Sequence, residues 1–167
     1  TKQSVVIRSK FVTTAEHAAL ANGMLAHADE TDDSHAPSLT HPGCGVVPAA
    51  LAMGERERSS GMQLLRAVAL GYDVGSRLSL SLHAHDFREA GHSTHSFGPM
   101  FGAAAAAGAL LGSNQRQARH MLSYTAQQAS GVSCWMRDEE HIEKAFDFGG
   151  MPARNGVCAA AMVAHGF

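Results

Sequence analysis

The sequence predicts an all-α protein, and three observations support this expectation. Apolar residues recur at intervals of three and four along most of the chain, as in amphipathic helices. No stretch alternates convincingly between apolar and polar residues, as a half-exposed strand would. Residues 97–112 space glycines among alanines, so one face of this segment has almost no side chains. We therefore expect a multi-helix domain with a small-residue Gly/Ala helix at its centre.

Capping residues and prolines mark the helices of the first half. A capping box at residues 13–16 opens a helix over residues 15–28. Pro42 suits the first turn of a short helix over residues 43–55, although Pro48 falls inside it. Ser60 and Gln63 then form a second capping pattern. They open a longer helix over residues 62–83.

The second half continues the helical pattern after a histidine-rich segment, residues 84–96, which we expect to be a loop. Further helices are expected over residues 97–112, 114–130, 138–146 and 153–165. Ser113 and Asp138 are the expected caps of two of them, while Gly131 and Gly166 follow helix ends. No repeat or internal linker divides the chain, so we expect residues 1–167 to form a single helical domain.

Composition and charge argue against several classes of protein. The chain has 167 residues, and its hydrophobic fraction of 45% is that of a globular protein. A formal net charge of -2 leaves no basic surplus for nucleic acid. The three cysteines are far apart and form no C-x-x-C pair, which argues against a disulfide framework and favours a reducing, cytoplasmic setting. The longest apolar run is too short to cross a membrane.

Both ends of the sequence look cut. It begins TKQSVV, with neither an initiator methionine nor a signal-peptide pattern, and it stops just after the signal that ends a helix. We therefore expect this chain to be a segment of a longer protein.

Residues 27–43, HADETDDSHAPSLTHPG, gather four carboxylates and three imidazoles in a chain of which only 17% is charged. Acids at the C-terminal end of a helix oppose its dipole, so stability alone does not favour them there. Two interpretations remain open: the acids are solvated or cap the next turn, or paired carboxylates contribute to acid–base chemistry. The spacing is not that of a calcium loop.

Three histidines stand at positions that suit a site. His41 precedes Pro42, which favours an extended backbone that projects the imidazole from the loop. His92 and His95 lie just before the expected helix N-terminus near Gly98, where unpaired N–H groups attract a carboxylate or phosphate. Simple helix capping by either histidine is the alternative.

Two further alternatives concern a metal and a lysine. A metal hydrolase could use a cluster of side chains, although no H-E-x-x-H motif and no cysteine support it. That cluster comprises His83, His85, Asp86, His92 and His95. Lys144 either pairs with Glu140 on an exposed helix face or binds a substrate carboxylate.

Several stretches, in this order, resemble the MmgE/PrpD family. They are HADETDDSHAPSLTHPG with VVPAALA, GYDVGSRL, GHSTHSFGPMFGAAAAAGALLG and IEKAFDFGGMPARNG. The family includes 2-methylcitrate dehydratase, cis-aconitate decarboxylase and iminodisuccinate epimerase. The resemblance runs from about Thr13 to Phe167. It implies the central part of a helical domain from a longer, homodimeric protein, whose α+β lid domain is missing from this chain.

The resemblance also implies site residues. In the family's H-x-x-[DE]-x-D-D-[TS] pattern, an acid and a serine or threonine line the active site with a later histidine. Glu30, Ser34 and His41 match these positions. His92 matches the family's second histidine better than His95 does. Lys144 matches the family's lysine, although EKAF here replaces KRF and favours a subfamily with a different substrate.

The function implied is a lyase, either a dehydratase or a decarboxylase, or else an epimerase. It would act on a small di- or tricarboxylate by acid–base chemistry, without a metal or organic cofactor. The expected catalytic residues are His41, His92, Lys144 and Glu30, and the expected substrate-binding residues are Ser34, Asp33, His95 and Gly98. We expect His41, His92 and Lys144 to converge on one cleft. The alternative is a non-catalytic helical fragment that associates through its small-residue face.

Overall fold

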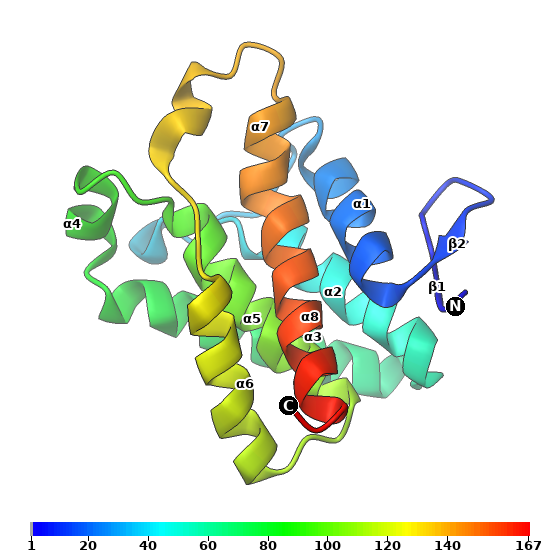
Figure 1. Cartoon of the computed structure of the whole chain (residues 1–167). Helices are drawn as coiled ribbons and strands as arrows, with labels where there is room; N and C mark the ends of the chain where they lie inside the picture. Colours follow the sequence, from blue (N-terminus) through cyan, green and yellow to red (C-terminus); the bar gives the residue numbers. More distant parts are fainter. Residues whose placement is uncertain (1) are drawn as a thin grey trace.

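The computed structural model describes residues 2–167 as a bundle of helices with one small hairpin at its edge (Figure 1). The helices are α1 (Ala15–His27), α2 (Pro42–Glu57), α3 (Gly61–Ser81), α4 (Ala84–Glu89), α5 (Thr94–Leu110), α6 (Gln115–Gln128), α7 (Ile142–Ala145) and α8 (Met151–Ala164). The hairpin pairs β1 (Ser4–Val5) with β2 (Val12–Thr13) in antiparallel register. The all-α prediction is confirmed. The hairpin was missed because two-residue strands are too short to show alternation.

Helix α5 lies at the centre of the bundle, between α3 and α8 (Figure 1). A Cβ added at Gly102 would lie 2.4 Å from the carbonyl oxygen of Gly71, and one at Gly98 would lie 2.8 Å from that of Gly75. Only glycine allows two helix backbones to approach so closely. The predicted small-residue helix is therefore confirmed. Its glycine face is filled by α3 of the same chain, so this face is not free for association.

The expected helix caps differ in accuracy. Ser60 and Gln63 cap α3 as expected, with the serine hydroxyl accepting from the Gln63 N–H. Ser113 was the wrong residue for the start of α6. The cap is Asn114, whose side chain accepts from the Gln117 N–H while the Gln117 side chain accepts from the Asn114 N–H. Asparagine and serine are comparable N-caps, so sequence alone does not separate neighbouring candidates.

One expected loop was also wrong. The expected loop over residues 84–96 contains α4 and the first turn of α5, which begins at Thr94. The hydroxyl of Thr94 donates to the carbonyl of Leu39 at 2.6 Å, and that of Ser96 donates to the carbonyl of Ser130 at 2.9 Å. These polar side chains are buried and satisfied by distant residues, so they belong to the helix although they look like a loop.

The last part of the chain forms one nearly continuous helical rod, since α7 runs through a π-helical turn, η3 (Phe146–Gly150), into α8 (Figure 1). This turn crosses α1, where a Cβ added at Gly149 would lie 2.1 Å from the carbonyl oxygen of Gly23. Asp138 accepts from the Lys144 N–H at 2.9 Å, although the capping position is His141. The close crossing brings Phe148 against the end of α1 and thereby shapes the site.

Within residues 2–167, no helix combines the length and the apolar character that a bilayer crossing requires.

Candidate active site

Aromatic rings from four parts of the chain gather around Phe148, which is almost completely buried. The ring of His95 stacks on it with centroids 4.0 Å apart and planes 4° from parallel. His27 lies 4.6 Å and His41 5.8 Å from the same ring, while Trp135 meets it edge-on at 4.8 Å. The crossing of α1 and η3 thus assembles an imidazole cluster around one phenyl ring.

Lys144 brings a positive charge to the same ring. Its Nζ lies 5.5 Å from the Phe148 centroid and 5.6 Å from that of Trp135, and it forms an ion pair with Glu30. The hydrogen bond from Lys144 lowers the pKa of the Glu30 carboxyl, so this group is ionised at neutral pH. Lys144 therefore pairs with an acid 114 residues away in sequence instead of Glu140.

The backbone of Glu30 explains how its side chain reaches α7. Its φ of 54° is left-handed, a conformation that non-glycine residues rarely adopt, and it turns the chain sharply just after α1. The same carboxylate oxygen lies 3.5 Å from Nδ1 of His141, whose φ of 58° is also left-handed. Two residues with left-handed backbone conformations, Glu30 and His141, thus lie at the same ion pair. Such strained residues are often found at functional sites.

His41 is held in one orientation. Its Nδ1 lies 2.6 Å from the carbonyl oxygen of Asp33, and because a carbonyl can only accept, Nδ1 must carry the proton. In the neutral imidazole the lone pair then lies on Nε2, which has no hydrogen-bond partner among residues 2–167. The ring lies 4.9 Å from that of His95, tilted by 27°. A half-buried imidazole with a free Nε2 is suited to act as a general base.

Asp33 has a structural use. Its Oδ1 accepts the N–H of Gly43 at 3.0 Å, so the carboxylate caps the first turn of α2. Burial and the nearby Asp33 carboxylate raise the pKa of Tyr72 to about 12, which keeps this phenol protonated. The neighbouring Ser34 is exposed at the edge of the same segment. The capping interpretation of the acidic stretch thus holds for Asp33.

The structure leaves His92 and Gly98 outside the cluster. His92 stacks on Phe87 with centroids 4.6 Å apart and meets Phe97 edge-on. Gly98 lies in the second turn of α5 and faces α3, since the expected start of this helix at Phe97 was wrong. The expected convergence of three residues therefore involves His95 instead of His92. A helix start at Thr94 places His95 in the first turn of α5, and that position would have favoured His95 over His92 as the site residue.

The two histidines predict a contrast between matched variants. Replacing His95 with alanine removes the ring between His41 and Phe148, so we expect loss of ligand binding or turnover by roughly tenfold or more. Replacing His92 with alanine removes a ring that packs on Phe87 and Phe97, outside the cluster around Phe148, so we expect activity near wild type. Kinetics on both purified variants check this. Equal losses in the two would contradict the placement.

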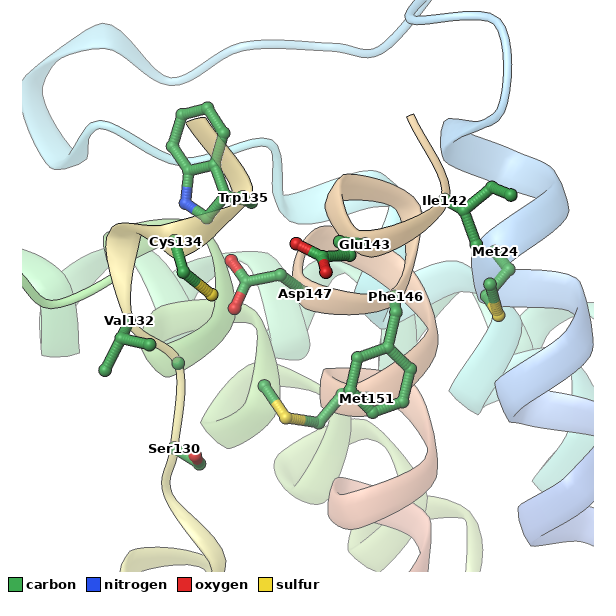
Figure 2. Close-up of a pocket in the computed structure, with 11 residues that line it drawn as sticks. Met24, Ser130, Val132, Cys134, Trp135, Ile142, Glu143, Phe146, Asp147 and Met151 are labelled. Atoms are coloured by element: carbon green, nitrogen blue, oxygen red, sulfur yellow. The ribbon is translucent and has the colours of Figure 1, made fainter. Parts of the chain in front are cut away.

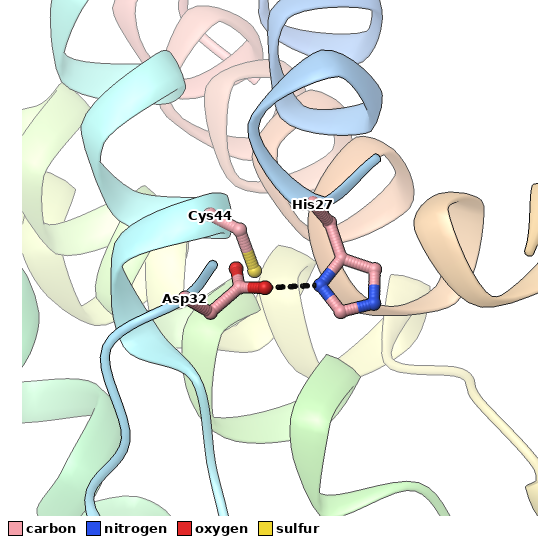
Figure 3. Close-up of side chains that lie close together, drawn as sticks. All are labelled: His27, Asp32 and Cys44. Atoms are coloured by element: carbon pink, nitrogen blue, oxygen red, sulfur yellow. Dashed lines mark hydrogen bonds and ion pairs between the residues drawn. The ribbon is translucent and has the colours of Figure 1, made fainter. Parts of the chain in front are cut away.

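One group of possible metal ligands exists among residues 2–167, namely His27, Asp32 and Cys44, whose ligand atoms lie within 4.8 Å of one another (Figure 3). The His83–His95 cluster is not gathered in this way. Burial raises the pKa of the Cys44 thiol well above its usual value, and this thiol donates to the carbonyl of His41 at 3.2 Å. Without a metal ion, this buried thiol is therefore protonated and hydrogen-bonded to a carbonyl.

A separate cavity of about 510 Å³ adjoins the cluster and shares Trp135 with it (Figure 2). Its lining is mainly apolar. The lining residues are Met24, Ser130, Gly131, Val132, Cys134, Trp135, Ile142, Glu143, Phe146, Asp147 and Met151. The sequence showed no motif for this cavity, because its walls come from segments that carry no shared pattern.

Asp147 is the buried carboxyl of this cavity. Only 7% of the residue is exposed, and the hydroxyl of Ser93 donates to its carboxylate. Burial outweighs the serine hydrogen bonds and raises the pKa of Asp147 to about 6. The folded state therefore holds this proton more tightly than the unfolded chain does.

This raised pKa predicts a pH dependence of stability. Between pH of about 4 and 6 the folded state binds more protons than the unfolded state, so stability is lost as pH rises through 6. In the wild type this loss of unfolding free energy is about 3 kcal/mol at most, and we expect Asp147→Asn to abolish it, because asparagine does not titrate. Urea unfolding of both proteins at pH 4 and pH 8 measures this. If the unfolding free energy changed by the same amount between the two pH values in both proteins, the prediction would be contradicted.

Fold and site together define an all-α domain in which imidazoles, one lysine and two paired carboxylates, Glu30 and Asp32, gather near Phe148. The chain belongs to the MmgE/PrpD family: the family's N-terminal domain matches residues 1–167. It is similar to the cis-aconitate decarboxylase-like protein oryM of Aspergillus oryzae, with 29% identity over 162 residues, covering 90% of this chain and 32% of that protein. It is also similar to the cis-aconitate decarboxylase of Mus musculus, with 32% identity over 134 residues, covering 77% of this chain and 27% of that protein.

The chain thus spans about a third or less of the length of these relatives. The family includes lyases of the dehydratase and decarboxylase type.

Proposed function

We propose that the protein containing this chain is a lyase that acts on a small di- or tricarboxylate, with His41 as its acid–base group. The observation that carries the proposal is the hydrogen bond from Nδ1 of His41 to the carbonyl of Asp33, which leaves Nε2 free as a base. Carboxylate substrates fit the names of the two relatives and the position of Lys144 beside the imidazoles.

In this mechanism Nε2 of His41 takes the proton from a carbon next to a substrate carboxylate. The C–H electron pair moves onto that carbon and its carboxylate, and then forms a C=C bond to the neighbouring carbon as the C–O bond there breaks. The departing hydroxide takes the proton from Nε2 of His41 and leaves as water. In a decarboxylation the C–C bond to a carboxylate breaks instead, carbon dioxide leaves, and the bond's electron pair stays on the remaining carbon. His41, which has first taken a proton from solvent on Nε2, donates that proton to this carbon. Because the carboxylate itself acidifies the neighbouring C–H bond, the step needs no cofactor.

Lys144 would stabilise the charge that develops on the substrate. In the folded chain Lys144 is paired with Glu30, so a substrate carboxylate must either displace Glu30 or bind Lys144 beside it. His95 cannot supply a second positive charge, since burial, with a smaller contribution from His41, lowers its pKa to about 3. His95 therefore acts as a neutral ring that orients His41 and the ligand.

Proton exchange tests the proposal for each reaction of this class, whichever product forms. The purified protein is incubated in D₂O with cis-aconitate, methylcitrate and simple hydroxydicarboxylates, and proton NMR follows deuterium incorporation, double bonds and loss of the carboxyl group. We expect exchange or turnover with at least one of them. A folded protein that exchanges no carbon-bound proton in any of them would favour a non-catalytic helical module instead.

A further inference from the structure

His27 and Asp32 form a buried pair that the proposed reaction does not use. Nδ1 of His27 lies 2.7 Å from Oδ2 of Asp32, and the two side chains are only 2% and 4% exposed (Figure 3). Burying such a pair removes both groups from water, and apolar side chains in its place are often as stable. A role in fixing one arrangement of the chain therefore explains the pair better than stability does.

The pair anchors the segment that orients His41. Asp32 is followed directly by Asp33, whose carbonyl accepts from Nδ1 of His41 at 2.6 Å and whose carboxylate accepts from the N–H of Gly43. Residues 30–34 have no helical or strand hydrogen bonding of their own. The orientation of the Asp33 peptide group consequently depends on side-chain anchors on both sides of it, and His27 supplies the anchor on α1.

The protonation of the pair agrees with this role. Burial lowers the pKa of His27, which favours the neutral imidazole despite the nearby Asp32. Neutral His27 donates its Nδ1–H to the Asp32 carboxylate, and its buried Nε2 has no hydrogen-bond partner among the described residues. Within residues 2–167, the bond to Asp32 is thus the single hydrogen bond that holds this ring.

We propose that His27 and Asp32 are positioning residues for His41: their hydrogen bond holds the Asp33 carbonyl against Nδ1 of His41 and keeps His41 in the tautomer with a free Nε2. The effect on catalysis rests on the proposed function. The effect on the tautomer does not, because it is a property of the folded chain without substrate.

Nitrogen-15 NMR of histidine-labelled protein tests the tautomer directly. In the wild type we expect the ring signals of His41 to show a protonated Nδ1 and an unprotonated Nε2. His27→Leu should shift these signals toward the mixture of tautomers of an unconstrained imidazole. His27→Asn, whose amide can still donate to Asp32, should restore the wild-type signals. His35→Leu is the control, since His35 bonds to Ser38 and not to this pair.

If His27→Leu does not fold, Asp32→Asn serves in its place, because it keeps the shape and weakens the acceptor. Unchanged His41 signals in a folded His27→Leu or Asp32→Asn protein would overturn the proposal. An equal change in His35→Leu would do so too. Zinc titration that yields one tightly bound ion on His27 and Cys44 would also overturn it, since the pair would then be a metal site.

Turnover provides the second measurement. We expect kcat of His27→Leu to fall by about a hundredfold with little change in KM, and His27→Asn to recover most of the loss. If His27→Leu changes the tautomer of His41 but the wild-type protein shows no turnover, the positioning role is supported and the proposed function is rejected. An unchanged tautomer with normal wild-type turnover would reject the positioning role alone.

Discussion

Replacing His41 with glutamine is expected to lower turnover by roughly a hundredfold to ten-thousandfold, the usual contribution of a positioned general base. Glutamine fills similar space, but its amide has no basic lone pair that can take a proton from carbon. Substrate affinity should change far less than kcat, because the carboxylate contacts of Lys144 remain. The deuterium-exchange assay measures the loss directly, since exchange reports the proton step alone.

The control for this experiment is His35→Gln. His35 belongs to the same histidine-rich stretch, but its Nδ1 bonds to the Ser38 hydroxyl at 2.7 Å, and it lies outside the ring cluster around Phe148. We expect this variant to exchange protons at close to the wild-type rate. Wild-type exchange in His41→Gln, or equal losses in both variants, would show that His41 is not the base.

The Gly149→Ala variant is expected to destabilise the fold by about 3 kcal/mol or more, because overpacking between rigid groups is costly. The added Cβ would lie 2.1 Å from the carbonyl oxygen of Gly23 and 2.7 Å from its carbonyl carbon. Both neighbours are backbone atoms of α1, so no flexible side chain can move away. Relief would require α1 and η3 to separate, which would also disturb the contact between His27 and Phe148.

Urea unfolding followed by circular dichroism measures this loss, with Gly61→Ala as the matched control. Gly61 lies in the first turn of α3, and a Cβ there would meet nothing within 4 Å. Alanine favours a helix over glycine by roughly 1 kcal/mol, so this control should be neutral or slightly stabilising. Similar stability of the Gly149→Ala and wild-type proteins would show that the crossing tolerates a wider spacing.

Local signals explain which parts of the fold were predictable. The capping box at Ser60 and the glycine spacing of residues 97–112 depend on neighbours in sequence, and both were confirmed. The start of α5 was missed because Thr94 and Ser96 are polar residues whose partners lie far away in the chain. The π-helical turn at residues 146–150 was missed because its last two glycines are needed for close packing against α1 and follow no local sequence pattern.

The site shows the same division. The acidic stretch was recognised as unusual, and its residues have different structural uses: Glu30 pairs with Lys144, Asp32 with His27, and Asp33 caps α2. Residue type and spacing indicate that carboxylates and imidazoles meet. They do not indicate which carboxylate pairs with which side chain or backbone N–H, because these pairs form only when distant segments pack together.

Helix content, the close-packed glycine face and the resemblance to a carboxylate lyase family follow from the order of residues, since periodicity, caps and motifs are local properties. The tautomer of His41 depends on the carbonyl of Asp33. The stacking of His95 on Phe148 and the pairing of Lys144 with an acid 114 positions away depend on the crossing of α1 with η3. That crossing exists because Gly23 and Gly149 let two backbones touch. No segment taken alone contains this contact.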